Sequence, residues 1–348
     1  MKFAKRLGLF IFAQCGIILG TGCASFPARQ PAGADATGSG KYRIVHARTG
    51  RHVNMTALAR ACRKADVVFF GEQHYDAICS AAQLDLLEAW SHPGAAALSM
   101  EFFDRDTQPD VDAYLAGRIS EAEFLTATKR DKKYATSHRP LLEYCRTHHH
   151  PVIAANAPRA LVRGYRNAGL PYAEYRKTLP AAEKRWLPVA FDQVSGSYEK
   201  SFREAMQHHA ANADENGIRA VRAAAHAQLE PPPVENMTEH LPGETKPAMP
   251  SVEQMFQAQL LWDNSMAEAI ANFRNCFPAQ PVLHIVGAFH VRAQGATAEI
   301  YHRRRPQDQS LTIVYETEAA DGSTWKPDPA VADYFILGLS NSVSGTAN

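Results

Sequence analysis

The segment Asp66–Asp76, DVVFFGEQHYD, shows the pattern that governs the whole chain. Its first half, Asp66–Phe70, is an apolar run rich in Val and Phe, which is typical of a strand covered on both faces. Its second half turns to polar and reactive side chains, among them Glu72 and His74. A buried strand that ends in such residues predicts a ligand site at the carboxyl end of a sheet.

Short apolar runs of the same kind recur along the chain, and helix-like segments separate most of them. The further runs are Tyr42–Val45, Ala96–Met100, Val152–Ala155, Val282–Val286 and Leu311–Tyr315. Alternation of strands and helices predicts βαβ units. We therefore expect an α/β fold with a mostly parallel sheet that helices cover on both faces.

Helical periodicity and start signals place the helices. The predicted segments are Pro109–Leu115, Ser120–Arg130, Pro140–His148, Pro158–Asn167, Tyr172–Trp186 and Ser251–Phe277. Ser120 and Ser251 each precede a Glu or Gln by three residues, which is the capping-box pattern of a helix start. Residues 42–348 are thus predicted to form a single α/β domain, with a mainly helical insertion at about 160–275.

Polar side chains follow four of the predicted strands directly. Because the carboxyl ends of parallel strands share one edge of a sheet, these side chains are expected to surround one crevice. The residues are Glu72, His74, Glu101, Asn156 and His290.

The two carboxylates of this set, Glu72 and Glu101, also have structural interpretations. Glu72 could cap the following helix, a role that Asp76 is expected to play. Glu101 ends an apolar strand, where a carboxylate is costly unless it is paired, so Arg105 or Arg159 could be its partner.

Three polar residues lie within or beside apolar patterns. Gln259 lies on the apolar stripe of the helix Ser251–Phe277, and Asp263 lies at its edge. Buried polar groups need partners, so both side chains could reach the crevice or hydrogen-bond to a loop. His284 lies inside its strand and is interpreted as a core histidine with satisfied hydrogen bonds.

The N-terminus has the layout of an export signal. A basic start and the apolar run Leu7–Leu19 precede small residues and Cys23, which predicts that 1–22 is a signal peptide and that Cys23 is lipidated. Ordinary cleavage or an uncleaved anchor is the alternative. Residues 23–41 are rich in Pro, Gly, Ala, Ser and Thr, as in a flexible tether. The prediction is an exported, membrane-anchored lipoprotein, and Ala24 supplies no acidic retention signal, which favours the outer membrane.

Composition limits the classes of ligand. The chain of 348 residues has a formal net charge of +1, and loss of the three basic residues of 1–22 changes it to −2, so no nucleic-acid partner is expected. The 6 Cys form no CxxC pair, so a thiolate zinc site is not expected. The Cys residues outside the N-terminal segment are expected to be buried thiols, which are favoured over disulfides. The 15 His residues favour metal or haem handling.

Six segments together resemble the ChaN-like haem-binding lipoproteins, which share a superfamily with the Tiki proteases and the erythromycin esterases. They occur in the family's order, whereas residues 208–250 match no family pattern. The segments are GEQHYD (71–76), MEFFDRDTQ (100–108), RPLLEYC (139–145), PVIAANAPRALVR (151–163), QLLWDNSMAEAI (259–270) and HIVGAFH (284–290).

The family resemblance implies a haem-binding surface lipoprotein of iron acquisition, with haem held between two subunits of a homodimer. Haem iron accepts His or Tyr as an axial ligand. The candidate ligands are His74, Tyr75 and His290 at the crevice, and Tyr198, His208 and His209 in the insertion.

Other residues would contact the remainder of the haem. Arg105 or Arg159 would bind the propionates, and aromatic side chains would form the walls. The predicted walls are Phe102, Phe103, Trp262 and Phe289, and Asn156, Gln259 and Asp263 complete the predicted site.

The superfamily resemblance implies a different function, a metal-dependent hydrolase of the peptidase or esterase type. His74 (with Gly71), Glu101 and His290 match its motif positions and would hold zinc or manganese with an open position for water. Glu72 or Glu101 would be the general base. Haem binding is favoured, and whether the chain is an enzyme stays open.

Overall fold

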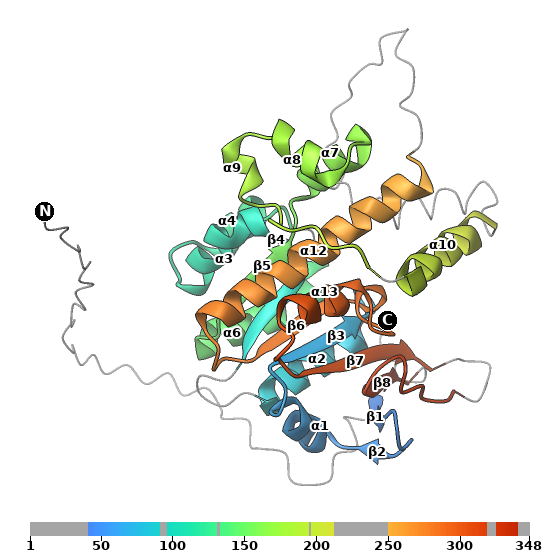
Figure 1. Ribbon diagram of the computed structural model, residues 1–348. Coiled ribbons are helices and arrows are strands. Elements are labelled where there is room, and N and C mark those ends of the chain that lie inside the picture. The colour runs from blue at the N-terminus through green and yellow to red at the C-terminus, as the bar shows by residue number, and fades with distance from the viewer. Residues whose placement is uncertain are drawn as a thin grey trace, which may run out of the picture. The chain divides into compact units, whose positions relative to one another are not determined.

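Strands of one sheet form the centre of the computed structural model (Figure 1). The structure describes residues 41–90, 96–130, 133–194, 196–211, 250–318 and 325–339. Within 196–211, side chains are described up to residue 207. The strands are β1 (Tyr42–His46), β2 (His52–Val53), β3 (Val67–Glu72), β4 (Ala97–Asp104), β5 (Val152–Asn156), β6 (Val282–Gly287), β7 (Ser310–Thr317) and β8 (Tyr334–Gly338).

The strand order is β2-β1-β8-β7-β3-β6-β4-β5. Each neighbouring pair from β8 to β5 is parallel, and β1 and β2 are antiparallel at one edge. The predicted α/β fold with a mostly parallel sheet is confirmed. The sequence pattern missed β2, which has only 2 residues, and β8, which follows β7 with no helix among the described residues between them.

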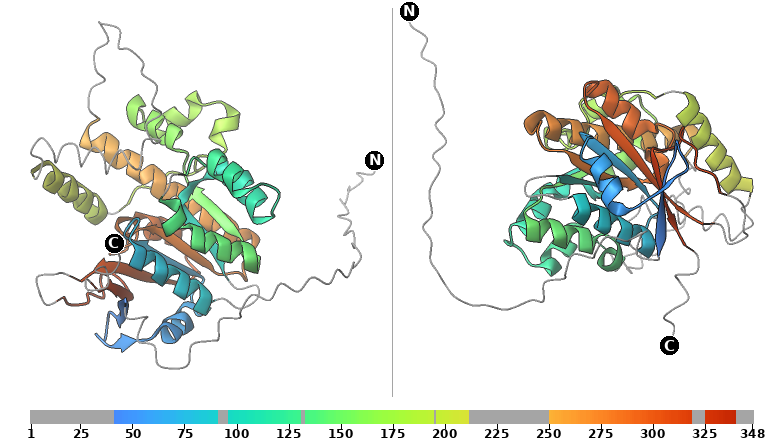
Figure 2. Two further views of the ribbon diagram at one scale, coloured as in Figure 1. Left: turned by 180° about the vertical axis from the view of Figure 1, so that it is seen from behind. Right: turned by 90° about the horizontal axis from the view of Figure 1, so that it is seen from below.

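Helices cover both faces of the sheet (Figure 2). One layer contains α1 (Met55–Cys62), α2 (Ala77–Trp90), α3 (Gln108–Leu115), α4 (Glu121–Ala127), α5 (Tyr134–Ser137) and α6 (Arg139–His148). The other contains α7 (Arg159–Ala168), α8 (Tyr172–Thr178), α9 (Ala181–Lys184), α10 (Gly196–Ala211), α12 (Val252–Cys276) and α13 (Ala296–Arg304).

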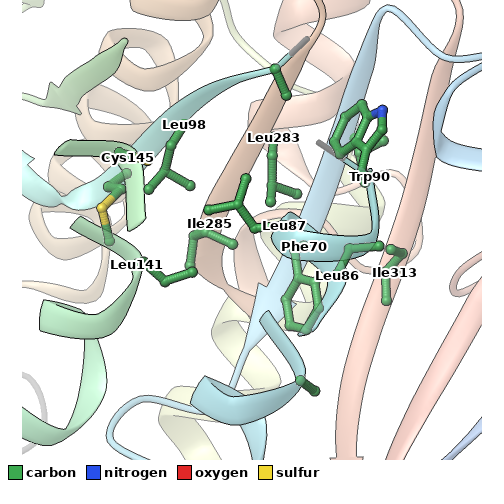
Figure 3. Packing of buried hydrophobic residues seen from close by; sticks show 14 of the residues in the cluster. Phe70, Leu86, Leu87, Trp90, Leu98, Leu141, Cys145, Leu283, Ile285 and Ile313 are labelled. Atoms are coloured by element: carbon green, nitrogen blue, oxygen red, sulfur yellow. The ribbon is translucent and has the colours of Figure 1, made fainter. Parts of the chain in front are cut away.

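The apolar strands supply both cores at once. Phe70 and Ile285 pack with Leu86 of α2 in one core (Figure 3), whereas Phe69 and Val286 face the other. Since successive side chains of a strand point to opposite faces, a continuous apolar run is what a doubly covered sheet requires.

Helix ends follow local chemistry. Ser120 and Ser251 both form the predicted capping boxes. The single helix predicted over Tyr172–Trp186 is instead split into α8 and α9, because Pro180 at the N-cap of α9 has no N–H for a continuous helix.

All described elements between β5 and β6 are helical, and α12 packs directly on the sheet (Figure 1). Ser265 of α12 donates a hydrogen bond to the carbonyl of Ala155 in β5, at 3.1 Å. This contact places the N-terminal half of α12 beside the carboxyl ends of the strands.

The predicted signal peptide 1–22, Cys23 and the tether up to residue 40 lie outside the described residues, as does the stretch 212–249. Within the ranges that the structure describes, no helix is long and apolar enough to cross a membrane.

Gly71 lies where the end of β3 meets the turn after β6. A Cβ on Gly71 would lie 2.9 Å from the Cα of Ala288 and 3.0 Å from Cγ2 of Val291. We expect Gly71→Ala to lower the free energy of unfolding by about 1–3 kcal/mol, because overpacking forces backbone shifts. Thermal or urea denaturation measures this loss. Gly196→Ala is the control, since nothing lies within 4 Å of its Cβ position; equal losses in the two variants would contradict the prediction.

Candidate functional site

The carboxyl ends of β3, β6, β4 and β5 meet at one rim of the sheet, where a cavity of about 250 Å³ opens. We call it the rim cavity. It is lined by Glu72, His74, Tyr75, Glu101, Phe102, His138, Asn156, Arg159, Trp262 and Ile285. Residues from six separate segments thus converge, four of them at the strand ends that the topology of a parallel sheet brings together.

Glu72 is 6% exposed and lies among three nitrogen groups. Its carboxylate is 2.7 Å from His74 Nδ1, accepts a hydrogen bond of 2.7 Å from Gln83, and lies 3.4 Å from His138 Nε2. Burial would raise the pKa of Glu72, but the charges and hydrogen bonds of His138 and His74 hold it below its usual range. Glu72 is therefore an ionised carboxylate of the cavity wall.

Asp76, not Glu72, caps the next helix. Its Oδ1 accepts hydrogen bonds of 2.8 Å from the N–H groups of Ile78 and Cys79 in α2. The cap interpretation of Glu72 is wrong because its carboxylate points back into the rim.

His74 carries a positive charge in this setting. Burial would lower its pKa, but the hydrogen bond to Glu72 and the charges of Glu101 and Glu72 raise the pKa to about 9. A side-chain exposure of 35% keeps part of the ring in contact with solvent. A Cβ at Gly287, the last residue of β6, would lie 3.1 Å from His74 Nε2, so glycine leaves room for the ring.

Glu101 is held from two sides. Its Oε2 accepts the N–H of Gly287 at 2.7 Å, and its Oε1 lies 3.7 Å from His290 Nε2. Burial would raise the pKa of Glu101, but the charges of His290 and His74 and this N–H lower it. Glu101 is a second ionised carboxylate at the rim.

Neither predicted arginine pairs with Glu101. Arg105 instead forms an ion pair of 3.1 Å with Glu268 of α12 and does not line the rim cavity. The interpretation that Arg105 pairs with Glu101 is therefore wrong, because Glu268 of α12 is its partner instead. Arg159 does line the rim cavity.

His290 lies behind the cavity wall and is 2% exposed. Its Nδ1 is 2.7 Å from Asp263, and its Nε2 is 3.1 Å from the Gln259 amide. Thr297 and Tyr198 donate hydrogen bonds of 2.6 Å and 2.9 Å to the same Asp263. Gln259 and Asp263 thus reach toward the strand ends, as one of their two interpretations predicted. They contact the ring of His290 there and do not line the cavity.

Burial would lower the pKa of His290, but the charges of Asp263 and Glu101 raise it. His284 is a core histidine, as predicted: it is fully buried, its Nδ1 lies 3.0 Å from the Ser99 hydroxyl, and burial lowers its pKa to about 3. The expectation that its hydrogen bonds are satisfied is wrong, because its buried Nε2 has no partner among the described residues.

Two of the predicted aromatic walls face elsewhere. Phe103 is fully buried among core residues, and Phe289 packs against Tyr198 and Phe202. Phe102 and Trp262 line the cavity as expected. The side chains of His208 and His209 lie outside the described residues.

Sequence reasoning missed His138 and Gln83, which both contact Glu72. They come from the helical layer on the opposite face from α12, at the start of α6 and within α2. No strand-end position marks either residue, so only the packing of that layer reveals them.

His74, Glu101 and His290 come together, yet the described residues contain no group of three or more His, Cys, Asp or Glu placed to hold a metal ion. Asp263 and Gln259 also lie within hydrogen-bond distance of the two ring nitrogens of His290. The metal-dependent alternative is not favoured.

Comparisons with known proteins agree with this architecture. Residues 58–300, more than half of the chain, match the family model described as haem-binding uptake, Tiki superfamily, ChaN. No curated protein matches the chain.

One similar solved structure describes cofacial haem binding to ChaN of Campylobacter jejuni. It is 14% identical, with a TM-score of 0.56, and the match covers 86% of this chain and 98% of that one, which shows a shared fold. A Bacillus cereus protein is 13% identical, with a TM-score of 0.35 over 80% of this chain and 72% of its own. The family match and the shared fold give one conclusion: this chain belongs to the ChaN family of haem-binding uptake proteins in the Tiki superfamily.

Proposed function

We propose that the protein binds haem at the mouth of the rim cavity, with Tyr75 as the axial ligand of the iron, and that a lipid on Cys23 holds it at the outer membrane for iron acquisition. Haem is the ligand of the family to which the chain belongs. The observation that carries the proposal is the placement of Tyr75, a side chain that is 42% exposed at the edge of the cavity.

The backbone of Tyr75 supports a functional role. Its φ of 64° lies in the left-handed region, which non-glycine residues seldom adopt and which concentrates at functional sites. The Lys133 ammonium lies 4.4 Å from the centre of the Tyr75 ring. Tyrosine is a known axial ligand of haem iron.

The competing ligands are less suitable. His290 and Tyr198 are 2% and 6% exposed, and both are hydrogen-bonded to Asp263. His74 is accessible, but with a pKa of about 9 its ring is protonated near neutral pH and offers no lone pair to iron. Tyr75 is an accessible candidate at the edge of the cavity, with 42% of the residue exposed.

The size of the cavity determines where the macrocycle would lie. A volume of about 250 Å³ is below the roughly 300–1,000 Å³ of sites that enclose a drug-sized ligand, so the porphyrin would cover the mouth. One face of the ring would then remain open to a second subunit. This supports a homodimer, and ChaN of Campylobacter jejuni binds haem cofacially.

The proposed location rests on the N-terminal sequence. A basic start, an apolar run and small residues before Cys23 support export and lipidation, and the Pro-rich and Gly-rich segment that follows would let the domain extend from the bilayer. A haem-binding domain outside the cytoplasm suits the capture of iron.

Removal of the Tyr75 hydroxyl tests the proposed ligand. Tyr75→Phe should shift the Soret band of the haem complex and weaken binding by at least about tenfold, or about 1.4 kcal/mol, because phenylalanine supplies no oxygen. Spectrophotometric haem titration measures both. Tyr144→Phe, on α6 and away from the cavity, should change neither. An unchanged Soret band in Tyr75→Phe would exclude Tyr75 as the ligand.

The raised pKa of His74 predicts a pH dependence of stability. Below pH 6.5 the ring is protonated in both folded and unfolded chains, so its pairing with Glu72 contributes fully. As the pH rises from 6.5 to about 9, the unfolded chain loses this proton first and the contribution disappears. The difference in free energy of unfolding between wild type and His74→Gln should therefore shrink over this range in urea titrations. A difference that does not vary with pH would contradict the proposed charge.

Lipid attachment is tested at Cys23. In cells that process lipoproteins, Cys23→Ser should abolish incorporation of labelled fatty acid and move the protein from the membrane fraction to the soluble fraction, because no thiol remains to be acylated. Cys62→Ser is the control, since Cys62 is buried in the domain. Label retained by Cys23→Ser would refute lipidation at this residue.

A further inference from the structure

The rim cavity has two walls of different chemistry. On the side of β3 and β4, Glu72 and Glu101 accept hydrogen bonds from described residues. On the side of β5 and α12, the lining residues Asn156, Arg159 and Trp262 carry side-chain N–H donors.

Trp262 is a buried donor without an acceptor. The residue is 4% exposed, and its indole Nε1 has no hydrogen-bond partner among the described residues. Its place is fixed by the hydrogen bond from Ser265, one turn further along α12, to Ala155. A buried unsatisfied polar group costs about 1–3 kcal/mol, so such a group in a cavity wall indicates a partner that arrives from outside.

Arg159, which also lines the cavity, has a second unsatisfied donor. Its backbone N–H binds Asp104 Oδ2 at 3.2 Å, but its side-chain Nε is buried without a partner. Within the described part of the chain, no carboxylate lies within 4 Å of its guanidinium, whereas Arg105 is paired with Glu268. Burial raises the pKa of Asp104, the facing acid, which weakens its power to neutralise Arg159.

Asn156 completes the group. Its side-chain oxygen accepts the N–H of Ala157 at 3.0 Å, which leaves its NH₂ as the donor. The charge of Arg159 also acts on His74, which is itself cationic, so an anion in the cavity would offset the repulsion between these two residues.

We propose that Asn156, Arg159 and Trp262 form a carboxylate-binding subsite in the rim cavity. A carboxylate accepts paired hydrogen bonds from a guanidinium and further bonds from amide and indole N–H groups. The cavity of about 250 Å³ admits such a group on a short aliphatic arm, although it does not admit a macrocycle. The source of the carboxylate is a haem propionate, in which case the inference rests on the proposed function, or a free short-chain acid.

Haem and haem dimethyl ester distinguish haem binding as such from binding of a propionate in the subsite, because only haem has free propionates. In spectrophotometric titrations, wild type should bind haem at least about tenfold more tightly than the ester, and Arg159→Met should abolish this preference while the Soret band of the haem complex stays in place. Arg163→Met, one turn further along α7 and not on the cavity, should keep the preference.

If wild type binds neither compound, the proposed function fails. If wild type binds both equally well, haem binding stands and the propionate as source is overturned. The comparison of haem with its ester uses wild type alone, so it does not depend on the folding of a variant.

A second measurement follows the subsite directly. The indole N–H resonance of Trp262, assigned by its loss in Trp262→Phe, is observed by NMR while haem, haem dimethyl ester or sodium propionate is added. A shift with haem but not with the ester supports a haem propionate as the occupant. A saturable shift with propionate ion alone, below millimolar concentration, supports a free acid. A resonance that responds to neither haem nor propionate overturns the subsite.

Discussion

Two carboxylates buried at one rim of the sheet impose the constraint on which the site depends. Glu72 ends β3, and Glu101 lies near the end of β4, with β6 between these strands. Removing a carboxylate from water is costly unless charged and hydrogen-bonding partners replace the water. The rim meets this requirement with His74 and His290, and with the N–H of Gly287 at the end of β6.

These partners come from both helical layers, so residues from the two faces of the sheet meet at the rim. His138 and Gln83 approach Glu72 from one helical layer, whereas α12 in the other layer holds His290 through Asp263. The charges of the carboxylates and histidines largely offset one another. Arg159 is the cavity cation left without a carboxylate within 4 Å among the described residues, so the site as a whole has capacity for an anion.

The same constraint separates haem chemistry from hydrolytic chemistry on this fold. His74, whose pKa is raised to about 9, is a poor ligand for iron or a divalent cation, because a ligand needs a free lone pair. His290 is a poor ligand as well, because Asp263 and Gln259 lie within hydrogen-bond distance of its two ring nitrogens. Tyr75 is an accessible side chain at the edge of the cavity, which is why we propose it as the ligand of haem iron. A family fold does not by itself fix the chemistry, which depends on the side chains of the site.

The sequence by itself determined the mostly parallel sheet apart from β2 and β8, and four of the polar residues that line the cavity, Glu72, His74, Glu101 and Asn156. It could do so because apolar runs followed by polar residues report burial and strand ends locally. It could not reveal that Arg105 pairs with Glu268, that His138 contacts Glu72, or that Trp262 is an unsatisfied donor beside Arg159. Only the tertiary structure decided these points, because each depends on which side chain of a distant segment lies nearest, and no local pattern encodes that distance.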